Sequence, residues 1–188
     1  MTESSIQTTR YLIQEKHLSL DERFRITDDS GVVRYKVNST FFAMGDKLLI
    51  SDANGNELLR IRQDNLHIRL TYKIFSCQSG IPVRQIATIK RTGSLWQHIL
   101  EITSEVGDFI LKKEGGPSSN EYVLMKNGTV IATATKDTSP TKNLYWIDIV
   151  DDQRIDHAFI LAMIIVLSCA QRLPGNPMTK PSSNISTN

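Results

Sequence analysis

The most constraining feature of this chain is an almost unbroken apolar segment of 13 residues near its C-terminus, residues 158–170. Asp156 stands before it as a candidate helix cap, and Pro174 follows soon after its end. A helix of this length spans about 20 Å, whereas a single bilayer crossing needs about 20 residues. A helix that is apolar all round must be buried. The segment therefore predicts a helix enclosed by the rest of the chain, and insertion into a membrane as an anchor is the disfavoured alternative.

The rest of the chain repeats a pattern typical of β-strands: short runs rich in Val, Ile, Leu, Tyr or Thr, separated by turns that carry Gly, Asn or Asp. A closed barrel of such strands encloses the helix and leaves no exposed sheet edge. We therefore predict a mainly β (α+β) fold, a closed antiparallel β-barrel of about 12 strands around a buried hydrophobic C-terminal helix. The predicted strands cover residues 10–15, 23–27, 32–37, 47–51, 57–62, 69–75, 83–90, 96–103, 108–112, 121–125, 130–135 and 144–149.

Three turns indicate how neighbouring strands pair. Each places Asn, Asp or Ser beside Gly, where a positive φ is tolerated and a hairpin can reverse. Apolar alternation flanks all three, so we expect hairpins there. The turns are Asp28-Asp29-Ser30-Gly31, Asp52-Ala53-Asn54-Gly55-Asn56 and Lys126-Asn127-Gly128-Thr129.

The alternation of apolar and polar residues assigns the two faces of the predicted sheet. Leu59 and Ile61 share one side of their strand, while Arg60 and Arg62 share the other. In the next strand the apolar side chains of Leu70, Tyr72 and Ile74 oppose those of Arg69, Thr71 and Lys73. One face is therefore expected to form the core and the other to face water.

Length and composition are those of one ordinary globular domain. The 188 residues fit a flexible N-terminus (1–10), a barrel domain (11–172) and a disordered tail (173–188) that is rich in Pro, Asn and Ser. The net charge of +2 is too small for a dedicated nucleic-acid binder. Cys77 and Cys169 lie in no metal-binding or redox motif and are predicted to be reduced. No secretory signal is visible, so we expect a cytoplasmic protein, with a peripheral membrane or nuclear location as alternatives.

Several segments in order resemble the LURP-one-related family. That family shares the fold of the tubby C-terminal domain and is related to the phospholipid scramblases. The resemblance covers residues 11–172 and implies a twelve-stranded barrel around a hydrophobic C-terminal helix. Tubby domains bind phosphoinositide headgroups through basic residues, and scramblases move lipids in response to calcium; kinship of fold alone transfers neither function. The segments are Tyr11-Leu-Ile-Gln-Glu-Lys-His-Leu-Ser, Phe24-Arg-Ile-Thr-Asp-Asp-Ser-Gly-Val-Val-Arg-Tyr-Lys-Val, Lys47-Leu-Leu-Ile-Ser-Asp-Ala-Asn-Gly-Asn-Glu-Leu-Leu and Tyr145-Trp-Ile-Asp-Ile-Val-Asp-Asp.

A run of basic residues is the best candidate binding site. A phosphate group is held well when two or more Lys or Arg side chains surround it, and this stretch contains only one acid, Asp64. The alternative is a solvated barrel face whose charges discourage aggregation. The candidate residues are Arg60, Arg62, Arg69, Lys73, Arg84, Lys90 and Arg91.

An acidic group before the helix, Asp148, Asp151, Asp152 and Asp156, suggests a weaker alternative. Oxygen-rich loops bind calcium, and scramblases resemble this chain in carrying acids before the final helix. The run lacks the spacing of an EF-hand loop, and helix capping explains it as well.

Catalytic patterns are missing from the sequence. The four histidines are scattered, and there is no H-E-x-x-H, G-x-S-x-G or glycine-rich phosphate loop. We therefore predict a non-enzymatic binding or scaffold module without a cofactor, whose partners are acidic membrane lipid headgroups or a protein. Two alternatives stay open: a calcium-responsive, scramblase-like lipid transporter, and a protein–protein interaction module in defence or stress signalling. The sequence does not indicate an oligomeric state.

Overall fold

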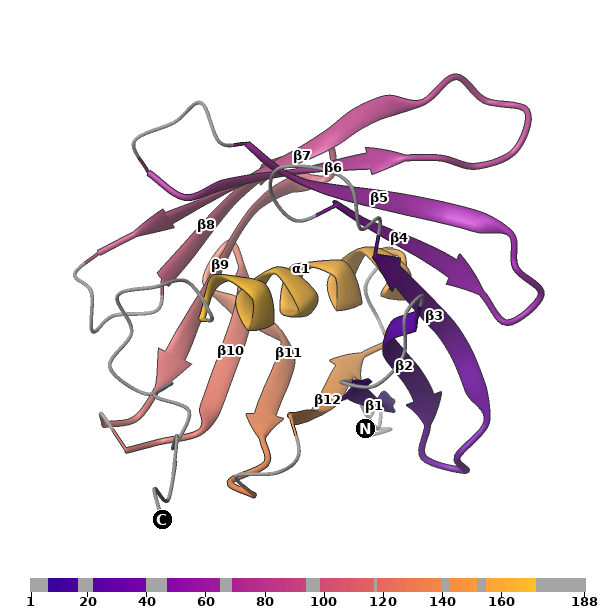
Figure 1. Cartoon of the computed structure of the whole chain (residues 1–188). Helices are drawn as coiled ribbons and strands as arrows, with labels where there is room; N and C mark the ends of the chain where they lie inside the picture. Colours follow the sequence, from indigo (N-terminus) through magenta and orange to yellow (C-terminus); the bar gives the residue numbers. More distant parts are fainter. Residues whose placement is uncertain are drawn as a thin grey trace, which may run out of the picture.

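Twelve strands surround one helix in the computed structural model, which describes residues 7–16, 22–39, 47–64, 69–93, 99–116, 118–139, 143–151 and 155–171 (Figure 1). The predicted number of strands and the single helix are confirmed. The elements are β1 (Thr8–Glu15), β2 (Glu22–Asp28), β3 (Val33–Ser39), β4 (Lys47–Asp52), β5 (Glu57–Asp64), β6 (Thr71–Ser76), β7 (Arg84–Thr92), β8 (Ile99–Ser104), β9 (Gly107–Glu114), β10 (Glu121–Lys126), β11 (Thr129–Lys136), β12 (Leu144–Val150) and α1 (His157–Ala170).

The strands form one closed antiparallel barrel in which each strand pairs with its neighbours in sequence. The first strand closes the ring on the last, with Tyr11 opposite Ile147 and Leu12 opposite Trp146. Closure gives every described strand two partners, so none of them presents an open edge to another chain. The predicted closed barrel is confirmed.

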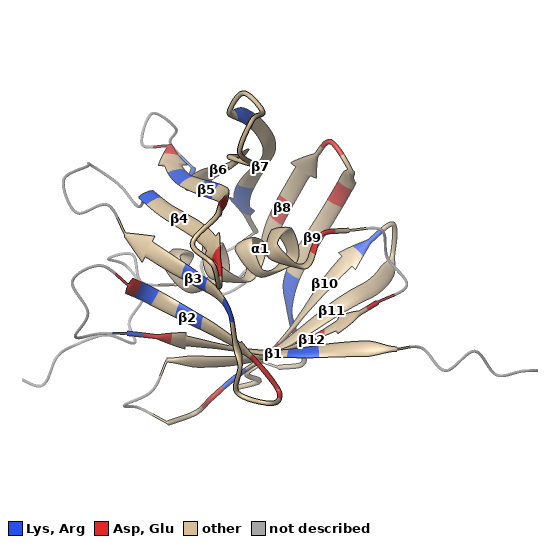
Figure 2. Ribbon diagram, turned by 90° about the vertical axis from the view of Figure 1, so that its right-hand side faces the viewer, with Lys and Arg blue, Asp and Glu red and all other residues tan. Residues whose placement is uncertain are grey.

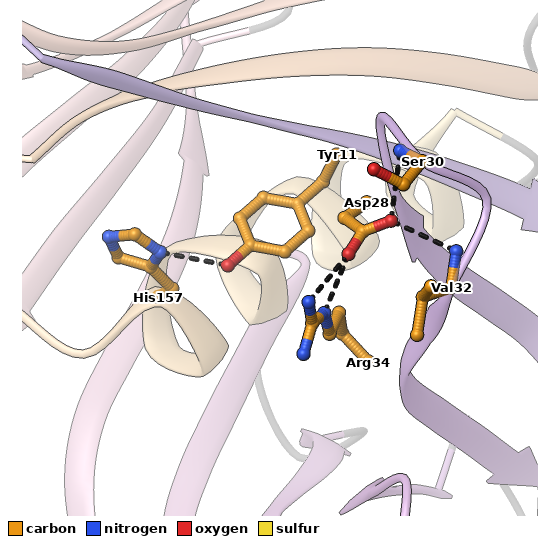
Figure 3. A network of polar contacts seen from close by, with 6 residues as sticks. All are labelled: Tyr11, Asp28, Ser30, Val32, Arg34 and His157. Atoms are coloured by element: carbon orange, nitrogen blue, oxygen red, sulfur yellow. Dashed lines mark hydrogen bonds and ion pairs between the residues drawn. The ribbon is translucent and has the colours of Figure 1, made fainter.

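Two of the predicted hairpin turns share one hydrogen-bonding scheme. The Asp28 carboxylate accepts bonds from the backbone N–H groups of Ser30 and Val32, at 3.0 and 2.9 Å, and pairs with Arg34 (Figure 3). The Asp52 carboxylate accepts from the N–H groups of Asn54 and Asn56 in the same way, at 2.9 and 2.8 Å. An aspartate that satisfies its own turn stabilises the reversal, which is why Asp-x-x-Gly predicted these hairpins correctly.

Alternation along the strands separates core from surface as predicted. Leu59 and Ile61 of β5 are buried in the lumen, while Arg60 and Arg62 point outward. Most strand bounds differ from the predicted ones by one or two residues; β6, for example, begins at Thr71 and not at residue 69. The Thr71 hydroxyl donates to the Arg69 carbonyl over 3.0 Å, while the Leu70 carbonyl still accepts a backbone bond from Arg91 of β7. Thr71 itself is only 1% exposed although its strand position faces outward.

The lumen of the barrel is filled by α1. Each residue from Ala158 to Ala170 is buried, and the ring of Phe159 meets Phe109 of β9 edge-on with the centroids 6.1 Å apart. Cys77 and Cys169 are both free thiols, as predicted. Within the described ranges no helix combines the length and apolar character needed to cross a bilayer.

The helix gives the barrel two distinct ends. It enters beside the β2–β3, β4–β5, β6–β7, β8–β9 and β10–β11 turns, which we call the entry end. It leaves at the opposite end, where Gln171 bonds to the hydroxyls of Tyr122 and Tyr145 over 2.8 and 2.9 Å. Three predicted features lie wholly or partly outside the described residues: the flexible start at 1–10 (up to residue 6), the strand at 96–103 (up to residue 98), and the tail at 173–188. The last part of the predicted flexible start, Thr8 to Arg10, instead belongs to β1.

Candidate functional site: a basic face on the outer wall

Three cations lie in one row across three neighbouring strands. The strand register places Lys47 of β4 opposite Arg62 of β5, and Arg62 opposite Lys73 of β6. All three occupy outward positions, because their sequence neighbours Leu48, Ile61 and the residues beside Lys73 are buried. Paired strands lie about 4.8 Å apart, so the backbone positions of all three cations fall within about 10 Å along the row.

Two further cations extend this row along the barrel. Arg60 lies two residues from Arg62 on the same side of β5, towards the entry end. Lys90 of β7 is opposite Thr71, which is two residues from Lys73 in the other direction. We call Lys47, Arg60, Arg62, Lys73 and Lys90 the basic face. In Figure 2 the blue segments of β4 and β5 lie on the same side of the barrel.

Acidic neighbours neutralise only part of the basic face. The Lys73 ammonium lies 2.7 Å from the Asp64 carboxylate, and the Arg60 guanidinium lies 3.7 Å from that of Glu57. The Arg62 guanidinium instead stacks over the outward ring of Phe75, 5.4 Å from its centroid. Among the described residues no carboxylate forms an ion pair with Lys47, Arg62 or Lys90, although Glu101 of β8 stands opposite Lys90 in the ladder. Phe75 therefore holds the Arg62 cation in place while leaving its donors available.

The other predicted basic residues are not brought into this row. Arg84 pairs with Glu105 at the entry end of the barrel. Arg91 is on the same side of β7 as the buried residues Ala87 and Ile89, which face the lumen. Its backbone N–H donates to the Leu70 carbonyl over 3.0 Å. Arg69 is exposed in the segment before β6.

Sequence reasoning missed Lys47, which completes the row. Lys47 lies on β4, 15 positions before Arg62, and so outside the basic run of residues 60–91. The signal was present in the predicted hairpin: pairing the two strands about the Asp52–Asn56 turn places Lys47 opposite Arg62.

The three described acidic residues before the helix, Asp148, Asp151 and Asp156, each have a separate structural partner. Asp148 holds the Arg10 guanidinium through two contacts of 2.6 and 3.0 Å, on the outer wall. Asp151 accepts from the Thr9 hydroxyl over 2.6 Å and lies 3.1 Å from His157 Nε2. Asp152 is outside the described residues. The parts of the chain that are described contain no group of three His, Cys, Asp or Glu residues placed to hold a metal ion.

Asp156 caps the helix, which supplies a prediction about this acidic group. Its carboxylate accepts from the Ala158 N–H over 2.8 Å. We expect Asp156→Ala to lower the free energy of unfolding by about 1 kcal/mol in urea titrations, because one N–H at the helix start loses its acceptor. The exposed turn variant Asp29→Ala should change it by less than about 0.5 kcal/mol. Equal effects of the two variants would show that the cap contributes nothing.

A polar cluster closes the entry end around the start of the helix. The Tyr11 hydroxyl lies 3.0 Å from His157 Nδ1 (Figure 3). The other ring nitrogen of His157 lies 3.1 Å from the Asp151 carboxylate. Burial raises the pKa of the Tyr35 phenol, which neighbours Tyr11, to about 12, and burial also raises the pKa of Tyr11. Both phenols therefore stay protonated at neutral pH. The cluster ties β1 and the start of α1 together through hydrogen bonds.

These features define a class of protein: a closed antiparallel β-barrel filled by its own helix, with its candidate site on the outer wall. The lumen holds α1, so a ligand has to approach from outside. The chain belongs to the LURP-one-related family, whose model matches residues 9–168. The fold that the sequence resemblance implied is thereby confirmed together with the family.

A solved structure gives the same fold. The chain is similar to an Arabidopsis thaliana protein whose X-ray structure is known, with a TM-score of 0.61 and 20% sequence identity. The match covers 88% of this chain and 92% of the other. No curated protein sequence matches the chain significantly.

Proposed function

We propose that this protein is a non-catalytic binding module whose basic face docks on acidic phospholipid headgroups, phosphoinositides among them. The observation that carries the proposal is the row formed by Lys47, Arg62 and Lys73 across three adjacent strands. Membership of the LURP-one-related family and the barrel fold support a binding module in general terms. On this proposal the protein acts at the cytoplasmic surface of a membrane.

The row has the chemistry that a phosphorylated headgroup needs. Arg62 offers a planar guanidinium for fork-like bonds, while Lys47 and Lys73 add compact charges on either side of it. These side chains stand on paired strands of a closed barrel, so their separation is set by the ladder and does not depend on a loop. A rigid array of cations attracts a surface of many phosphates better than a mobile tail of equal charge, because less side-chain entropy is lost.

Co-sedimentation with vesicles tests the proposal. We expect the purified protein to pellet with phosphatidylserine or phosphoinositide vesicles and not with neutral ones, and to bind more weakly as salt rises. The variant Arg62→Glu/Lys73→Glu should bind at least about 30-fold more weakly at low salt, because each basic residue at an anionic surface contributes about 1 kcal/mol.

The matched control is Lys36→Glu/Lys112→Glu, which makes the same change in net charge on β3 and β9, outside the basic face. It should retain most of the binding. Equal losses in the two variants would attribute binding to net charge alone and would contradict a defined face. Binding that requires calcium and survives Arg62→Glu/Lys73→Glu would favour the scramblase-like alternative. Failure of the wild-type protein to pellet with any vesicle would rule out the lipid proposal and favour a protein partner.

A further inference from the structure

One corner of the entry end exposes apolar side chains. Ile81 and Val83, in the connection from β6 to β7, are 53% and 55% exposed, and Val106 in the β8–β9 turn is 47% exposed. An ion pair between Arg84 and Glu105 joins the two connections, because these residues directly follow Val83 and precede Val106 in sequence. We call Ile81, Val83 and Val106 the apolar corner. Half-exposed aliphatic groups gathered on neighbouring connections mark an interaction site more often than single exposed ones do.

The apolar corner gathers more exposed aliphatic side chains than the other turns at this end, among which the β2–β3 turn exposes Val32 at 51%. The neighbouring β4–β5 turn carries Asp52, Ala53, Asn54, Gly55 and Asn56, with no large apolar side chain. Its aspartate satisfies the backbone of the turn, as described above. The two hairpins therefore offer an apolar tip and a polar tip within the same molecule.

The apolar corner continues the basic face along one hairpin. Strand β6 runs from the cationic row at Lys73 past Phe75 to Ser76, where the connection to β7 begins. Three residues of strand cover about 10 Å. Figure 1 shows the β6–β7 hairpin extending beyond the barrel alongside β5, the strand that carries Arg60 and Arg62. The cation Lys73 and the exposed side chains of Ile81 and Val83 thus lie one after the other along the β6–β7 hairpin.

The charges beside the apolar corner permit contact with a membrane. Arg84 neutralises Glu105, the acid next to Val106. Screening by salt weakens the attraction of the basic face for headgroups, whereas the burial of apolar area is not screened. Peripheral proteins combine these two contributions when they bind to a bilayer surface.

We propose that the apolar corner inserts Ile81 and Val83 into the interfacial region of the acidic bilayer whose headgroups the basic face binds. The inference rests on the proposed function and adds the orientation of the barrel: the wall formed by β5 to β7 faces the membrane, with the β6–β7 connection reaching deepest. The partner is thus a lipid surface, and a soluble headgroup alone would engage only the basic face.

An environment-sensitive label tests this orientation. Ile81→Cys and Asn54→Cys are each labelled with a nitrobenzoxadiazole dye and mixed with phosphatidylserine vesicles; the parent protein with its buried Cys77 and Cys169 gives the background. We expect the dye at position 81 to brighten, shift to the blue and be quenched by brominated lipid tails. The dye at position 54 should keep its aqueous spectrum.

A second variant separates the apolar contribution from the charges. Ile81→Asn/Val83→Asn should weaken vesicle binding about tenfold, by the same factor at low and high salt, because it removes apolar burial alone. Its binding of soluble inositol phosphate should be unchanged. Wild-type binding without any change at the position-81 dye would overturn the insertion and leave the basic face intact. Absence of wild-type binding to acidic vesicles would overturn both proposals and leave the corner to a protein partner.

Discussion

Ile165→Asp should leave the chain without a stable folded state. Ile165 lies in the middle of α1 and is 0% exposed, enclosed on all sides by the barrel. A carboxyl group there loses the aliphatic packing and finds no solvent, which costs more than about 4 kcal/mol. Since whole domains are stable by only about 5–15 kcal/mol, one such change removes most of the margin. Circular dichroism with urea unfolding, or limited proteolysis, measures the loss.

The control is the same substitution on the outer wall. Ile110 of β9 is 46% exposed and faces Glu101 and Met125 across the ladder. Ile110→Asp should cost about 1 kcal/mol at most, through weaker strand propensity and repulsion from Glu101. Comparable destabilisation at both positions would mean that the helix is not the core of this protein.

The aromatic contact between barrel and helix should have the second-largest effect. Phe109→Ala and Phe159→Ala are each expected to lower the free energy of unfolding by about 3–5 kcal/mol, because each deletes a ring buried in a closed lumen. The lumen is bounded by hydrogen-bonded strands on every side, so it cannot collapse readily around the lost volume. Urea unfolding of the two single variants measures these costs.

A double-mutant cycle with leucine tests the contact itself. Phe109→Leu and Phe159→Leu keep most of the buried area, so the double variant should still fold. The two changes should couple by about 0.5–1.5 kcal/mol, as edge-to-face rings do. Phe109→Leu combined with Ile13→Val on β1, which does not pair with β9, should be additive within about 0.5 kcal/mol. Additivity in both cycles would argue against a direct ring contact.

The architecture could be predicted from sequence because its determinants are local. Aspartate–glycine turns specify their own hydrogen bonds, as Asp28 and Asp52 show, and alternation assigns each side chain to a face once a strand is recognised. The apolar segment of 13 residues at 158–170 is too short to cross a bilayer and has no polar face, so its helix has to be buried inside the barrel. The start of β6 at Thr71 differs from the predicted residue 69, because Val, Ile, Leu, Tyr and Thr content does not mark where a ladder begins.

The candidate site was less accessible, because proximity in sequence differs from proximity on a barrel. Arg84 and Arg91 lie near Lys90 in the chain, but neither joins the basic face. Arg84 pairs with Glu105 at the entry end, and Arg91 is on the same side of β7 as the buried residues Ala87 and Ile89. Lys47 is farther away in sequence but lies directly opposite Arg62. Residue type and strand order suffice to find a charged face. Deciding which residues belong to that face requires the register of every pair of strands.

The closure of β1 on β12 also dictates when this protein can fold during synthesis. Thr9 and Asp151 bond across 142 positions, and α1 comes later still. A ribosome makes the strands first and the filling of the lumen last, so the nascent chain carries an apolar lining with nothing to cover it. Long-range pairing of this kind folds slowly. Folding in the cell must therefore wait for the C-terminal helix, and a chain that stops before residue 157 is destined for chaperones or proteases.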